Sequence, residues 1–97
     1  MMTVYVAAVQ VAIERLAALA DDLAERGFAT QIKKVDRGLR LHVVNRTVRQ
    51  LSEDVWAGPT VDGLWWFWWS WGEPIAGIDH VDAAALKIAH VLAPRNG

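Results

Sequence analysis

The feature that most constrains this chain is the aromatic run at positions 64–71, which reads Leu-Trp-Trp-Phe-Trp-Trp-Ser-Trp and holds five of the six tryptophans. Gly63 and Gly72 flank the run, and aromatic enrichment over about eight residues between glycines favours a β-strand over a helix. Side chains alternate between the two faces of a strand, so both faces are apolar here and both need cover. One face carries Trp65, Phe67, Trp69 and Trp71, and the other carries Leu64, Trp66, Trp68 and Ser70.

The composition is that of a small folded domain. A hydrophobic content of 54% and a charged content of 22% over 97 residues are globular values. The net charge of −1 gives no overall reason to expect a nucleic acid or an anionic membrane as partner. With no cysteine, disulfides and thiolate metal sites are excluded. The N-terminus lacks a basic leader and no apolar run approaches a membrane span, so we expect a cytoplasmic protein with no membrane partner.

Two amphipathic helices are expected, one at each end of the chain. In residues 3–26, apolar side chains recur at spacings of three and four, among them Ile13, Leu16 and Leu23, and Gly27 is expected to end the helix. The second helix is expected to begin at Asp79, whose side chain would cap the free backbone N–H groups.

Four strands are expected between the helices. Residues 29–35 and 39–45 form a hairpin across Asp36-Arg37-Gly38, in which Gly38 supplies a positive φ. The third strand spans residues 50–56, and a loop over residues 57–63 leads into the tryptophan strand. Pro74 lacks an N–H and is expected to prevent a further strand.

The predicted fold class is therefore α+β, with the order α-β-β-β-β-α. It is one domain, a four-stranded antiparallel meander packed by the N- and C-terminal helices. The apolar faces of the helices and of the second strand are expected to meet in a single core. That core is predicted to contain Ile13, Leu16, Leu23, Leu41, Val43, Ile88 and Leu92.

The C-terminal half of the sequence resembles a group of small actinobacterial proteins. The likeness lies in Leu51-Ser52-Glu53, in the run from Trp65 to Ile75, and in the capped helix that follows. These proteins have no established activity, so the resemblance implies no catalytic residues. In element order alone, the chain is also similar to secretion-chaperone-like α/β domains, which act as dimers; fold by itself does not define function.

We expect no enzymatic activity, metal or cofactor. The three histidines are dispersed: His42 lies in a predicted strand, His80 in the first turn of the second helix and His90 on its outer face. Ser70 has no glycine two positions before it and cannot form a nucleophile elbow. No glycine-rich phosphate loop is present.

The tryptophans have three possible roles, of which dimerisation is favoured. If both helices cover one face of the sheet, the aromatic side chains of the other face would form a patch larger than monomers usually expose. A second copy of the chain, or another protein, could cover this patch, so we expect a self-association and protein-binding module, a homodimer that acts in a regulatory complex. The alternatives are an entirely internal core and a pocket for a flat or cationic ligand. The predicted interface residues are Trp56, Trp65, Trp66, Trp68, Trp69 and Trp71.

A second hypothesis is nucleic-acid binding. Basic residues gather in the predicted hairpin and the turn after it, next to the aromatic strand, and such a combination can follow phosphates and stack bases. The acidic helices and the negative net charge count against it, and a solvated hairpin explains the same charges. The candidate residues are Lys33, Lys34, Arg37, Arg40, Arg46 and Arg49.

Overall fold

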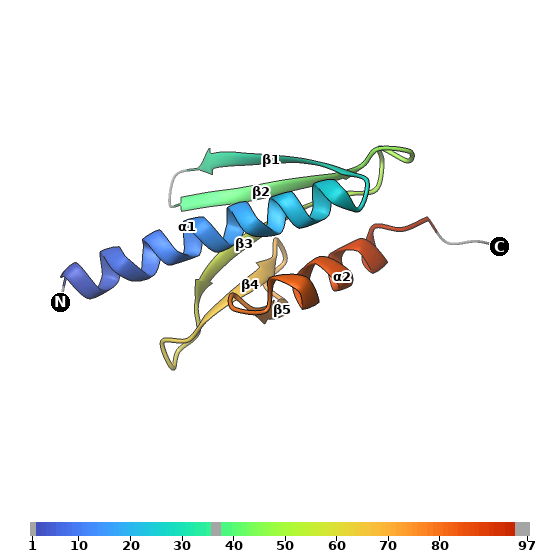
Figure 1. The fold of residues 1–97 in the computed structure, drawn as a ribbon. Helices are drawn as coiled ribbons and strands as arrows, with labels where there is room; N and C mark the ends of the chain where they lie inside the picture. Colours follow the sequence, from blue (N-terminus) through green and yellow to red (C-terminus); the bar gives the residue numbers. More distant parts are fainter. Residues whose placement is uncertain (1, 36–37, 95–97) are drawn as a thin grey trace.

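The computed structural model describes residues 2–35 and 38–94 and shows two helices and five strands (Figure 1). In chain order these are α1 (Met2–Glu25), β1 (Phe28–Val35), β2 (Gly38–Asn45), β3 (Ser52–Pro59), β4 (Trp65–Trp69), β5 (Pro74–Gly77) and α2 (Val81–Val91). The strands form one antiparallel sheet in the order β1-β2-β3-β4-β5. The predicted α+β meander with terminal helices is therefore confirmed.

The sheet has one strand more than the sequence predicted. Pro74 does not prevent the fifth strand, because it is the first residue of β5 and pairs with Trp68 at the edge of the sheet. Proline is tolerated at the first residue of an edge strand and beside an irregularity in the ladder, and the register between β4 and β5 shifts at Phe67 and Trp68. β3 also extends to Pro59, through residues expected to form a loop.

The ends of the helices agree only in part with the predictions. Gly27, with φ of 96°, follows α1 as predicted. The prediction of Asp79 as the cap of α2 was wrong: the N-cap is His80, whose side chain makes no capping hydrogen bond. Asp79 instead lies in the preceding turn, where its Oδ1 is 3.5 Å from Nη2 of Arg15 in α1. Gly38 begins β2 with a φ of 150°, whereas Asp36 and Arg37 lie outside the described residues.

Both helices cover the same face of the sheet, and a single core lies between the two layers (Figure 1). The centre of this core is formed by completely buried side chains from every layer, among them Leu19, Leu41, Val55, Phe67 and Ile88. The predicted core residues are buried with one exception.

Ile13 is that exception, with 36% of its surface exposed. The buried stripe of α1 runs through Ala12, Leu16, Leu19 and Leu23, and Ile13 lies at its border. The spacing of apolar residues in α1 is compatible with a buried stripe through Ile13 and with one through Ala12. Because Ala12 has a small side chain, the sequence did not show that the stripe through Ala12 is the buried one.

Asn45 links the end of β2 to both the following loop and α2. Its Nδ2 donates to the carbonyl oxygen of Leu92 at 2.9 Å, which satisfies a free carbonyl at the end of α2. Its Oδ1 accepts from the backbone N–H groups of Thr47 and Val48 at 2.9 and 3.0 Å. The side-chain amide of Asn45 thus connects β2, the loop that follows it and the C-terminal end of α2.

Candidate functional site

The aromatic strand β4 has the alternation that its sequence predicts. Phe67 and Trp69 point to the helices and are 0% and 2% exposed, and Trp65 packs against the same core. Trp66 and Trp68 point to the opposite side and are half-buried. The predicted interface tryptophans therefore lie on both faces of the sheet. Trp65 and Trp69 lie on the face that the helices cover.

The opposite side of the sheet, which neither of the two described helices covers, carries a row of cations and indoles. Lys33 pairs with Arg40, Arg40 with Trp56, and Trp56 with Trp68, each on a neighbouring strand. Residues paired across antiparallel strands share a face, so this row runs across four strands. We call this surface the helix-free face; it also contains Trp66, His42 and Asp54.

Trp56 and Trp68 stack on each other at the centre of the helix-free face. Their ring centroids are 5.6 Å apart and the ring planes differ by 16°. The indole N–H of Trp68 donates to the Gly58 carbonyl at 3.0 Å, and that of Trp56 donates to the Trp69 carbonyl at 3.1 Å. Since both polar groups are satisfied within the chain, the outward surface that remains is almost purely apolar.

A polar pair lies beside the stacked indoles. His42 Nδ1 and Asp54 Oδ1 are 2.7 Å apart on paired residues of β2 and β3. Both side chains are partly exposed, at 31% and 39%. Polar groups that surround an apolar centre are typical of protein interfaces.

A groove on the helix-free face adjoins the indoles. Its volume is about 260 Å³, and its walls include Trp66 and Trp68 of β4, Pro74 of β5 and Asp62 of the β3–β4 loop. Leu64, 62% exposed, lies at the same groove. We call this the aromatic groove; an indole surface next to a carboxylate can hold a cationic side chain. The sequence does not predict the aromatic groove, because Asp62 and Pro74 come close to Trp66 only in the folded chain.

Trp71 lies outside this arrangement. It follows β4 in the turn to β5 and is 53% exposed. Its ring stacks on that of Trp69, with centroids 4.9 Å apart and planes 6° apart, and its indole N–H donates to Glu73 at 3.0 Å. Trp71 therefore extends the helix-facing layer.

The predicted basic residues do not form one surface. Lys33 and Arg40 share the helix-free face, whereas Lys34 pairs with Leu39 on the opposite side. Arg46 and Arg49 lie in the loop after β2. Arg37 is outside the described residues.

Within residues 2–35 and 38–94, no group of three or more histidine, aspartate or glutamate side chains could hold a metal ion. Over the same residues, neither helix combines the length and the apolar character needed to cross a membrane. No protein-family model, curated protein or solved structure matches the chain.

Proposed function

We propose that this chain is a non-enzymatic self-association and protein-binding module, a homodimer built on the helix-free face. The observation that carries the proposal is the asymmetry of this face. Lys33 and Arg40 lie on one side of the Trp56–Trp68 stack, and the aromatic groove with Asp62 lies on the other. A surface with a cationic half and an aromatic, acidic half is complementary to its own copy.

A specific arrangement satisfies this complementarity. Two sheets can face each other about a two-fold axis parallel to the strands that passes between β3 and β4. Trp56 then lies against Trp68 of the second copy, and β2 lies across from β5. Arg40 thereby reaches the aromatic groove of the second copy, where an indole and a carboxylate favour its guanidinium.

The area of the helix-free face limits the affinity between the two copies of the chain. Five strands about 4.8 Å apart, of 8, 8, 8, 5 and 4 residues at about 3.3 Å per residue, give a face of roughly 500 Å². Standard stable interfaces bury about 800 Å² per partner. We therefore expect a dimer that dissociates at low protein concentration.

The test is light scattering of the wild-type protein and three variants over a concentration series. The wild-type mass should rise from monomer to dimer, and Trp68→Ser should stay monomeric, because it removes the stack and a wall of the groove. Trp71→Ser is the matched control: it removes an exposed tryptophan outside the helix-free face and should dimerise like the wild type. Arg40→Glu should also be monomeric while remaining folded, because its side chain is not part of the core.

A wild-type protein that remains monomeric throughout the concentration series would rule out the homodimer. Loss of dimer in Trp71→Ser together with its retention in Trp68→Ser would place the interface elsewhere. Circular dichroism of each variant separates a monomer from an unfolded chain.

Binding of single-stranded nucleic acid is the second candidate, and one observation favours it. Lys33 and Arg40 continue into Trp56 and Trp68 in one row, so phosphates and bases would find cations and rings on the same face. Affinity for random single-stranded DNA should then fall steeply with salt, and Arg40→Gln should lessen the salt dependence. The absence of measurable binding near physiological salt would remove this candidate.

A further inference from the structure

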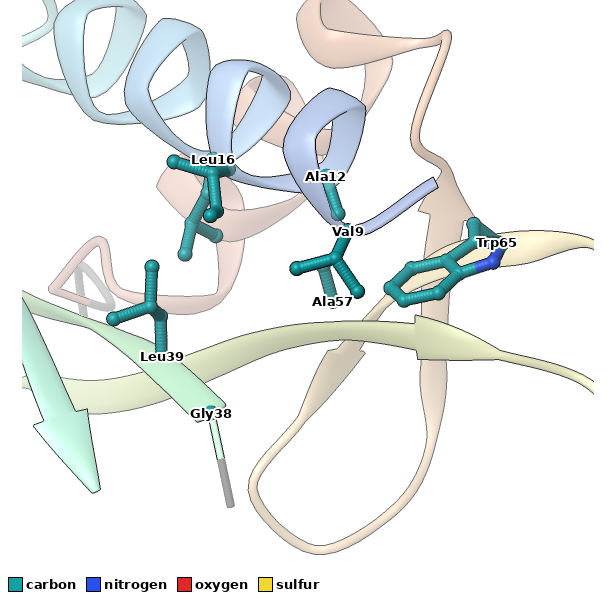
Figure 2. A pocket seen from close by; sticks show the side chains of 8 residues that line it. Val9, Ala12, Leu16, Gly38, Leu39, Ala57 and Trp65 are labelled. Atoms are coloured by element: carbon teal, nitrogen blue, oxygen red, sulfur yellow. The ribbon is translucent and has the colours of Figure 1, made fainter. Parts of the chain in front are cut away.

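A separate cavity lies on the side of the sheet that the helices cover, between the N-terminal half of α1 and the sheet (Figure 2). Its volume is about 150 Å³, and it is partly open to solvent. The walls are formed mainly by Val9, Ala12 and Leu16 of α1, Leu39 of β2, Ala57 of β3 and Trp65 of β4.

The cavity exists because small residues meet where larger ones would close the gap. Ala12 and Ala57 face each other across the two layers, and Gly38 adds no side chain at the lower wall (Figure 2). A Cβ atom at Gly38 would meet no heavy atom within 4 Å. The core beside it is closely packed, so this open volume lies at the edge of the core, where a small ligand can enter from solvent.

We propose that this cavity is a binding site for a compact, uncharged apolar molecule about the size of benzene. The volume of about 150 Å³ equals that of an enclosed apolar cavity that takes up benzene, so a molecule of this size fits. Among the lining residues that the structure describes, none has a charged side chain, and the indole N–H of Trp65 is their only polar side-chain group, so this lining favours an apolar ligand over a charged one.

The position of the cavity indicates that a bound ligand would stabilise the N-terminal half of α1. A second cavity, of about 540 Å³, lies beside the same half of α1 and is lined by Ala8, Val11 and again Trp65. Of the described side chains of α1, Leu19 and Leu23 are fully buried, whereas Val9 in the N-terminal half lines the smaller cavity. An apolar ligand that fills the smaller cavity would hold this half of the helix against Trp65. This site is independent of the proposed dimer, since it lies under the helices.

The experiment is a titration of the full chain with benzene, followed by methyl and indole NMR signals. Signals of Ala12, Ala57 and Trp65 should shift in a saturable way, and benzene should raise the melting temperature. Ala12→Leu fills the cavity and should weaken benzene binding by about tenfold or more. Ala18→Leu is the matched control, because it makes the same change at an exposed position of α1 and should bind like the wild type.

Ala57→Val provides a second way to fill the cavity if Ala12→Leu does not fold, and it should weaken benzene binding in the same direction. The proposal is overturned if the wild type shows no saturable shift up to the solubility limit of benzene. It is equally overturned if the filled variants bind as the wild type does, or if glycerol binds as well as benzene.

Discussion

At position 58 the indole of Trp56 occupies the space that a side chain would need. A Cβ atom on Gly58 would come within 2.4 Å of Cζ3 of Trp56, a distance that real contacts do not show. The Gly58 carbonyl also accepts the indole N–H of Trp68. The backbone of one glycine thus supports both rings of the central stack, and the shape of the helix-free face depends on it.

The first prediction follows from this contact. Gly58→Ala should displace the Trp56 ring and lower the free energy of unfolding by about 1–3 kcal/mol, a range typical of overpacking. The near-ultraviolet circular dichroism of the coupled indoles should weaken as well. Urea unfolding and dichroism spectra measure the two effects.

Gly77→Ala is the control for this change. Gly77 lies in β5, and a Cβ atom there would be 3.5 Å from Cδ2 of His80, which is ordinary contact. Equal effects of the two substitutions would show that Gly58 has no special steric role.

At the scale of the elements, both helices contribute described side chains to one core. α1 is anchored by Leu16, Leu19 and Leu23, and its N-terminal half lies over the cavities and projects beyond the sheet (Figure 1). The molecule is accordingly elongated, with extents of 51 × 22 × 22 Å. Among the described side chains of α1, the large buried ones therefore lie in its C-terminal half.

The second prediction tests this docking. Leu19→Ala should lower the free energy of unfolding by about 2–5 kcal/mol, because the side chain is fully buried and leaves a cavity in the core. Leu86→Ala makes the same change on α2 at a side chain that is 58% exposed, and should shift stability by less than about 0.5 kcal/mol. Denaturant midpoints compare the two; similar losses would mean that α1 does not dock through Leu19.

At the scale of the whole molecule, the sequence predicted what depends on local periodicity. The alternation of side chains in β4 followed from the period of two in a strand. The fifth strand was missed because the effect of Pro74 depends on whether its strand is at an edge.

The candidate site was predictable only in part, for a related reason. Both faces of β4 carry tryptophans, so its pattern does not say which face the helices cover. That choice depends on where α2 crosses after β5, which is a tertiary property. The aromatic groove likewise depends on the approach of Asp62 and Pro74 to Trp66.

The measurement that tests the central claim most directly is the distance between spin labels on two copies of the chain. The protein has no cysteine, so Ser52→Cys on β3 provides a single labelling site on the helix-free face, and Ala18→Cys on α1 provides one on the outside of the helix layer. Packed sheets lie about 10 Å apart, so the labels at position 52 should be within about 25 Å of each other. Those at position 18 should be more than about 30 Å apart, because two helix layers, each about 10 Å thick, lie between them. Labels at position 52 that show no coupling, or a shorter distance at position 18, would contradict a dimer built on the helix-free face.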